Sequence, residues 1–266
     1  MGEEILQKQP SGFRLVLSLV RRDYAVQYAG TVLGVVWVIV QNLFQIGIYY
    51  LIFGIVLADR RAGLMPMGGR DYLLYLLGGM TLWLPLAEMM VRSGGILSEN
   101  RVLIRRTSVG ADYFVWVPVV QAILHYALLA VPIALIGYGR GGLSPYFPIA
   151  WLAGLLLLLL AAGWGFILAR ISLLLKDVSP LAQLLLQVFF WATPIVYPVT
   201  DGTFKFFIWN PFYVLVELHR GLLFEMPGTR LPDIPFWNGL TALVALSIPV
   251  YVIGSRRLKW IVADHI

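Results

Sequence analysis

Six long apolar runs constrain this chain more than any other feature of its sequence. A helix needs about 20 apolar residues to cross the hydrocarbon core of a bilayer. We predict six membrane-spanning helices, at residues 31–57, 72–91, 113–137, 147–169, 180–199 and 236–254. The expected fold class is therefore an all-α, polytopic membrane protein, in which residues 1–266 form a single transmembrane domain.

Composition supports a lipid environment. Hydrophobic residues make up 59% of the chain and charged residues only 13%, whereas soluble domains carry about 25% charged residues. The net charge of +6 is typical of membrane proteins with basic cytoplasmic loops, so we expect no nucleic-acid partner. Because cysteine is absent, disulfides and thiolate metal sites are excluded.

The distribution of Lys and Arg predicts the orientation of the chain. Most of these residues fall on the side that holds the N-terminus, including those around Arg105 and Arg256. The excess of positive charge marks the cytoplasmic side of a membrane protein. Both termini are therefore predicted in the cytoplasm, and Arg220 falls on the outer side, where a labelling reagent should reach it.

Residues 11–28 predict an amphipathic helix on the cytoplasmic membrane surface, joined to the first span near Gly30. Apolar side chains recur at helical spacing along one side of this segment. They are Phe13, Val16, Leu17, Val20, Tyr24 and Tyr28. Arg14, Arg21 and Arg22 share the other side, where anionic lipid headgroups would attract them. The alternative is an ordinary positive flank that orients the first span.

The apolar stretch 204–224 is too interrupted for a seventh span. Asn210 followed by Pro211 is typical of a helix start, with Asn as N-cap and Pro at the first helical position. A helix from Pro211 to Phe224 would be about 21 Å long, too short for a hydrocarbon core of about 30 Å. We therefore predict re-entrant or interfacial structure over residues 200–235, on the outer side.

Few residues in the predicted spans could carry catalysis. Glu88 is the only carboxylate inside a predicted span, and Arg92, four residues later, could pair with it on the same helix face. His125 is the only histidine inside a span, and we expect it to hydrogen-bond a neighbouring helix. No Walker motif is present, so the chain is not expected to hydrolyse ATP by itself. We predict no catalytic residues and no metal site.

Neutral polar and aromatic residues form stripes on two predicted spans. Trp37, Gln41, Gln45 and Tyr49 recur every four residues in the first, and Gln183, Gln187 and Trp191 repeat the pattern in the fifth, with Tyr197 following. Amides in hydrocarbon are costly unless they are paired or face a wet cavity. Two interpretations stay open at this point: hydrogen bonding between helices, and the wall of a path for a hydroxyl-rich solute.

The basic segment 93–110 connects the second and third spans on the cytoplasmic side. It contains a short helix-like core whose apolar residues we expect to be exposed. These are Ile96, Leu97, Leu103 and Ile104. Exposed apolar residues favour a docking site for a cytoplasmic protein. The alternative is a solvated loop that rests on the membrane.

Four stretches in succession resemble the membrane subunits of type-2 ABC polysaccharide exporters. They are "RRDYAVQYAGTVLGVVWVIVQNLFQ", "ENRVLIRRTSVGADYF", "LLKDVSPLAQLLLQVFFWATPIVYPV" and "IWNPFYVLVELHRGLLF". This family exports O-antigen, capsular polysaccharide or teichoic acid from the bacterial inner membrane. The resemblance implies a homodimer of this subunit and two copies of a separate ATP-binding subunit, which binds ATP and Mg. It also implies a lipid-linked polysaccharide as substrate; the chain itself needs no cofactor.

The resemblance also assigns roles to residues. The first and fifth spans would line the channel, which favours a lining role for the two stripes and Tyr197. The ATPase would dock on the coupling segment, through Ser98, Glu99, Asn100, Arg101, Leu103, Ile104, Arg105 and Arg106. The outer gate would carry Asn210, Pro211, Glu217 and Arg220. Two alternatives remain: an exporter of a drug or lipid, and, less favoured, an intramembrane transferase acting on lipid-linked sugars.

Overall fold

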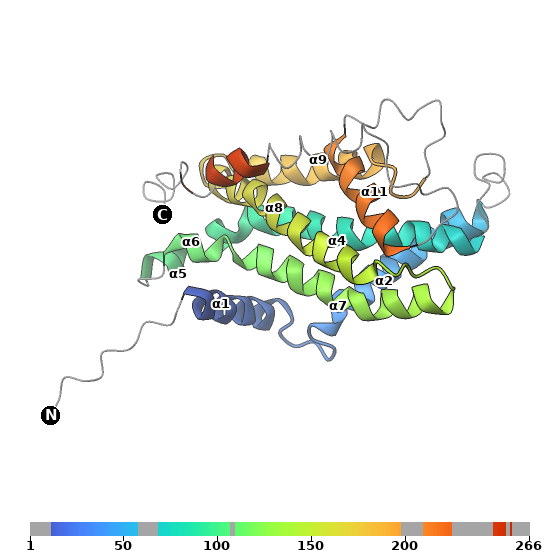
Figure 1. The fold of residues 1–266 in the computed structure, drawn as a ribbon. Helices are drawn as coiled ribbons and strands as arrows, with labels where there is room; N and C mark the ends of the chain where they lie inside the picture. Colours follow the sequence, from blue (N-terminus) through green and yellow to red (C-terminus); the bar gives the residue numbers. More distant parts are fainter. Residues whose placement is uncertain are drawn as a thin grey trace.

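A computed structural model of the chain describes residues 12–57, 69–106, 110–197, 210–224, 247–253 and 256. Within these ranges the chain forms helices joined by short connections (Figure 1). The described residues contain one isolated antiparallel bridge, between Leu143 and Phe224, and no named strand. The prediction of an all-α membrane protein is confirmed.

The helices of the described part have the following bounds. They are α1 (Gly12–Gln27), α2 (Val36–Tyr49), η1 (Tyr50–Val56), α4 (Gly69–Glu99), α5 (Arg101–Arg106), α6 (Ala111–Phe114), α7 (Val117–Gly139), α8 (Phe147–Leu174), α9 (Val178–Ala192) and α11 (Pro211–Leu223). Residues 247–253 add a further helical segment.

Four helical stretches in the described part are long and apolar enough to cross a bilayer. They are Val36–Val56, Tyr72–Glu99, Ala111–Gly139 and Phe147–Leu174, and α9 is a shorter apolar helix. Most of the predicted sixth span, 236–254, and most of the predicted outer segment, 200–235, lie outside the described residues. The total of six spans and the cytoplasmic termini therefore stay predictions.

Helix α4 is the centre of the bundle and packs against α7, α8, α9 and α11. Its side chains facing these neighbours, such as Tyr72, Leu76 and Met80, are fully buried. Figure 1 shows α5 and α6 at one end of the bundle and the connection between α7 and α8 at the opposite end. Helix α11 lies near that second end, where the bridge from Leu143 reaches Phe224.

Two glycines separate the surface helix α1 from the first long span. Gly30 and Gly34 have φ angles of +76° and +53°, which glycine adopts without the clash that a Cβ would cause. The regular helix consequently begins at Val36, five residues after the start of the predicted span.

Helix α4 is longer than the span predicted at 72–91, because it continues without a break to Glu99. The first part of the coupling segment is therefore the end of a core helix. Ile96 and Leu97 belong to the hydrophobic core, each with 1% of its surface exposed. The expectation that these two residues are exposed was wrong, because the continuing helix directs them toward its neighbours. Leu103 and Ile104, on α5, are half-buried.

Candidate functional site

A cavity of about 680 Å³ lies between α2, α4 and α9, and we call it the amide cavity. Its volume falls within the range of about 300–1,000 Å³ that is usual for ligand sites. Five residues of the predicted stripes line it: Gln41, Gln45, Tyr49, Gln187 and Trp191. The structure thus brings together two stripes that lie about 140 residues apart in the sequence. Among the described residues, Trp37, Gln183 and Tyr197 do not line this cavity.

Aromatic rings join the three helices at one end of the amide cavity. The ring of Tyr49 on α2 lies 5.4 Å from that of Phe190 and 6.5 Å from that of Trp191, both on α9. Trp83 of α4 completes the group, with its ring 5.9 Å from that of Phe190. Tilted and edge-on ring pairs at these distances are favourable, so this contact sets the rotation of α2 and α9 toward the cavity.

Helix α4 supplies lining residues that the stripes did not predict. Trp83, Glu88 and Arg92 all face the amide cavity, and Asn42 of α2 lies beside the predicted stripe. One signal was available in the sequence: Glu88 and Arg92 are polar residues in an otherwise apolar span. Nothing in the sequence showed that α4 would lie between the two stripes.

Glu88 and Arg92 do not pair with each other, so the predicted ion pair was wrong. Oε2 of Glu88 lies 2.6 Å from Nδ1 of His125. Arg92 donates to Oδ2 of Asp23 at 2.7 Å and lies 3.6 Å from Oε2 of Glu99. Arg92 therefore pairs with a residue of α1 and Glu88 with a residue of α7, instead of pairing with each other. The expected interhelical hydrogen bond of His125 is confirmed.

Helix α1 is held to the bundle by a group of polar contacts. Besides Arg92, Asp23 accepts a hydrogen bond from Nε2 of Gln121 at 2.7 Å. The hydroxyl of Tyr24 lies 2.7 Å from Nε2 of His125. Burial and the nearby Glu88 carboxylate raise the pKa of Tyr24, so the phenol stays protonated. It can therefore act as a donor to the imidazole.

The three arginines predicted at lipid headgroups differ in their surroundings. Arg14 and Arg21 are exposed, and their contact with headgroups stays a prediction. Arg22 is half-buried, donates to Oδ1 of Asn100, and lies over the ring of Phe114 with 5.8 Å between Cζ and the ring centroid. It thus links α1 to the turn between α4 and α5.

The predicted ATPase-docking residues lie at the end of α4 and on α5. Most of these side chains are exposed: Ser98, Glu99, Arg101, Arg105 and Arg106. Asn100 is buried, and its Nδ2 donates to the carbonyl of Ile96 at 2.8 Å. It therefore closes the end of α4. The sequence did not predict a further ion pair, in which the buried Arg170 of α8 donates to the partly exposed Asp112 of α6 at 2.7 Å.

The start of α11 confirms the helix boundary predicted at Asn210. Its Oδ1 accepts from the backbone N–H of Phe212 at 3.0 Å, and Pro211 follows as the first helical residue. The same amide donates through Nδ2 to the carbonyl of Ala192 at 3.0 Å and to Oγ1 of Thr193 at 2.9 Å. Asn210 therefore caps α11 and holds the end of α9 with one side chain.

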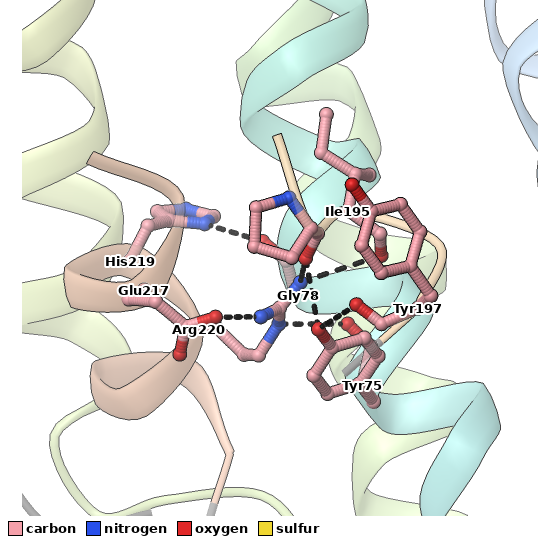
Figure 2. Close-up of polar contacts among 8 residues, drawn as sticks. Tyr75, Gly78, Ile195, Tyr197, Glu217, His219 and Arg220 are labelled. Atoms are coloured by element: carbon pink, nitrogen blue, oxygen red, sulfur yellow. Dashed lines mark hydrogen bonds and ion pairs between the residues drawn. The ribbon is translucent and has the colours of Figure 1, made fainter. Parts of the chain in front are cut away.

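Arg220 is completely buried where α11 meets α4 and the end of α9 (Figure 2). Its Nε donates to the carbonyl of Tyr75 at 3.0 Å, and its Cζ lies 3.6 Å from the centroid of the Tyr75 ring. Nη2 lies 3.2 Å from the carbonyl oxygen of Pro194, and Nη1 pairs with Glu217. The prediction that Arg220 is accessible from outside was wrong, because α11 directs this side chain toward backbone carbonyls inside the bundle.

The carbonyls of Pro194 and Ile195 can accept from Arg220 because α9 ends within the bundle. Thr193 has an extended backbone, with ψ of 130°, so the following residues leave the helical hydrogen-bond pattern. The hydroxyl of Tyr75 lies 2.8 Å from the carbonyl oxygens of Pro194 and Tyr197, and Tyr72 donates to Val196 at 2.7 Å. Irregular backbone within a membrane is tolerated only where protein or water satisfies it. We call this region, residues 193–197 with Tyr72, Tyr75 and α11, the α9–α11 junction.

His219 completes the α9–α11 junction as a neutral, buried ring. Nδ1 lies 2.8 Å from the carbonyl oxygen of Gly78, and Nε2 lies 2.6 Å from the hydroxyl of Tyr126. Burial lowers the pKa of His219 to about 4, so the ring donates from Nδ1 and accepts at Nε2. Burial raises the pKa of Glu217, while the positive charge of Arg220 opposes this shift.

Comparison with known proteins agrees with this architecture. Residues 14–224 match the family model described as ABC-2 type transporter. A protein of Myxococcus xanthus named O-antigen export system permease protein RfbA is 24% identical over 243 residues, or 88% of this chain and 87% of that protein. Two Klebsiella pneumoniae proteins of the same name are 24% and 25% identical, over 89% and 91% of this chain and 91% and 87% of their own lengths. Because the family match spans most of the chain, this protein belongs to the ABC-2 type transporter family, as a multi-pass membrane subunit.

Proposed function

We propose that this chain forms the channel of an exporter that moves a lipid-linked polysaccharide across the bacterial inner membrane. The amide cavity carries this proposal, because it gathers neutral amides and aromatic rings inside an otherwise apolar bundle. The similarity to three O-antigen export permeases supports the class of cargo.

The chemistry of the cavity suits a sugar chain. Gln41, Gln45 and Gln187 each offer two donors and a carbonyl acceptor, so they can exchange hydrogen bonds as successive hydroxyl groups pass. Tyr49 and Trp191 present flat apolar rings on which the C–H faces of sugars can pack. An amide binds each hydroxyl weakly, and weak binding at several positions allows a polymer to move on.

Export by this chain would require an ATP-binding partner, since no Walker motif occurs in the sequence. We place two copies of that ATPase, with bound ATP and Mg, against the exposed residues of the coupling segment, such as Arg101 and Arg105. A second copy of this chain would close the channel. The exposed apolar residues of α2 and η1, such as Phe44 and Leu51 respectively, support such a neighbour.

The α9–α11 junction would serve as the base of the outer gate. Asn210 and Arg220 anchor α11 to α9 and α4, and Glu217 pairs with Arg220 within α11, so movement of α9 would be passed directly to α11. On the other face, Arg14 and Arg21 of α1 would contact anionic lipid headgroups.

Substitution of the cavity amides tests the proposed function. Each of Gln45→Leu and Gln187→Leu is introduced into the chain in its own host, and surface polysaccharide is measured by gel and by antibody or lectin binding. We expect export to fall severalfold at unchanged membrane abundance of the protein. Gln27→Leu, at the exposed end of α1, is the matched control and should leave export normal. Unchanged export in the Gln45→Leu/Gln187→Leu double variant would contradict the proposal.

The partner is tested separately by purification from native membranes. We expect an ATP-binding subunit to co-purify with this chain and to be lost when Arg101 and Arg105 are both changed to Glu. A stable protein that purifies without any ATPase would contradict the exporter assignment.

A further inference from the structure

Aromatic, amide and charged side chains occupy different parts of the amide cavity. It extends along α4 from Trp83 to Arg92, nine residues or about 14 Å of helix. The aromatic rings gather at the Trp83 end, as the ring of Trp83 lies 5.9 Å from that of Phe190. The charged side chains lie at the Arg92 end, and amides from α2 and α9 line the space between.

The amide region is built for uncharged polar groups. Nδ2 of Asn42 is buried and has no hydrogen-bond partner among the described residues. Such a donor is costly unless a bound group satisfies it. Gln41, Gln45 and Gln187 are exposed to the same space. Hydroxyl groups can accept from the amide N–H groups and donate to the amide oxygens, whereas a carboxylate or phosphate can only accept.

The charged end of the cavity is already neutralised and slightly acidic. Arg92, the cation among the described lining residues, donates to Asp23 at 2.7 Å and lies 3.6 Å from Glu99. Glu88 also lines the cavity, and its carboxylate is held by His125 at 2.6 Å. The guanidinium of Arg92 therefore already pairs with two carboxylates, and a third, that of Glu88, lines the cavity, so the positive charge at this end is compensated.

Acidic polymers would meet repulsion at this point. A phosphate or carboxylate that reaches the Arg92 end approaches Glu88, whose side chain is 36% exposed. Like charges repel more strongly where water is partly excluded than in bulk solvent. A neutral sugar would meet no such repulsion and would keep its hydrogen bonds to the amides.

We propose that the amide cavity selects a neutral, hydroxyl-rich glycan and disfavours polymers that carry a phosphate or carboxylate on each repeat. This inference rests on the proposed function in polysaccharide export and narrows the substrate class. The aromatic end holds the C–H faces of the sugars, the amides bind their hydroxyls, and the Glu88 end screens out negative charge.

Binding of two short probes to the purified complex in lipid nanodiscs tests the proposal. The probes are maltohexaose, which is neutral, and hexagalacturonate, which has a carboxylate on every sugar. Binding is followed at pH 7 and 0.15 M salt by tryptophan fluorescence, and the cavity's share of the signal is identified as the part lost in Trp191→Phe. We expect the neutral probe to bind at least tenfold more tightly than the acidic one.

A variant that adds a positive charge to the cavity provides the second test. Gln187→Lys places a cation among the amides, and we expect it to raise the affinity for hexagalacturonate at least tenfold relative to the affinity for maltohexaose. Gln27→Lys, on the exposed end of α1, should change neither affinity. Equal or tighter binding of the acidic probe by the unaltered protein would overturn the proposal, as would a fluorescence change that is undiminished in Trp191→Phe. Neither result would bear on the exporter assignment, which the purification and export experiments above test separately.

Discussion

Nδ1 of His125 lies 2.6 Å from the Glu88 carboxylate on the wall of the amide cavity. Nε2 of the same ring lies 2.7 Å from the hydroxyl of Tyr24 on the surface helix. A single buried imidazole thus connects α1, α7 and α4. The position of α1 and the orientation of Glu88 depend on each other through this ring.

Replacement of His125 should loosen α1 and lower stability. His125→Phe removes both hydrogen bonds and leaves Glu88 and Tyr24 without their partner, which we expect to cost about 1–3 kcal/mol. Thermal unfolding of the purified complex measures the loss. Tyr24→Phe removes one bond and should cost less, about 0.5–1.5 kcal/mol. The double variant should lose less than the sum of the two single losses. Strict additivity would show that the three groups do not act as a unit.

Arg220 is expected to be a structural residue that tolerates little change. Arg220→Leu leaves Glu217 and the carbonyls of Tyr75 and Pro194 without their donor, and we expect a loss of about 3–5 kcal/mol. Arg220→Lys should recover only part of it, since an ammonium cannot reproduce the planar fork of donors. Arg140→Leu, an exposed position that follows α7, is the control. The measurements are folded yield and thermal stability. Similar values for the two leucine variants would refute the inference that Arg220 holds α11 to α4 and to the end of α9.

Gly78 permits the close approach of α11 to α4. A Cβ at this position would lie 2.7 Å from Cγ and 3.1 Å from Cα of Arg220, so Gly78→Ala should push the helices apart. We expect destabilisation of about 1–3 kcal/mol, as for other overpacked sites. A Cβ at Gly47 of α2 would meet nothing within 4 Å. Gly47→Ala should therefore be neutral, or stabilising by up to about 1 kcal/mol through helix propensity. Thermal unfolding compares the two, and the reverse order would argue against the close contact.

The neutral state of His219 should make the α9–α11 junction sensitive to acid. Its pKa is about 4 in the folded protein and about 6.5 when unfolded. Between these values the unfolded chain binds the extra proton, so stability falls as the pH drops from about 6.5 toward 4. The slope is at most about 1.4 kcal/mol per pH unit.

The variant His219→Gln isolates this contribution, since it keeps a donor and an acceptor without titrating. Unfolding curves of the two proteins are compared between pH 7.5 and pH 5. We expect the unaltered protein to lose stability more steeply than His219→Gln over this interval. Parallel pH dependences would show that His219 is not kept neutral by its burial.

Features that depend on local spacing were predicted from the sequence. The apolar runs predicted the long helices, and Asn210-Pro211 predicted the start of α11. The four-residue spacing of Gln41, Gln45 and Tyr49 predicted that these side chains share one face of α2. Each conclusion needs only the geometry of a single helix, in which residues four apart lie one above the other.

Pairing between helices could not be predicted in this way. Glu88 and Arg92 lie at the spacing of an ion pair, yet each binds a residue from another helix, His125 and Asp23 respectively. The burial of Arg220 likewise depends on carbonyls freed where α9 ends, about 25 residues earlier in the chain. A buried polar group must find a hydrogen-bond partner, and the packed bundle can bring a residue that is distant in sequence closer in space than a residue four positions away.

The sequence by itself determined that this chain is a helical membrane protein, where its long helices run, and which polar residues share a helix face. Only the tertiary structure decided that two of those faces meet on α4 to enclose the amide cavity, and that Arg220 turns inward. The physical reason is that helical periodicity sets the side of a helix on which a residue lies, whereas the rotation of the helix and its neighbours follow from packing of the whole bundle.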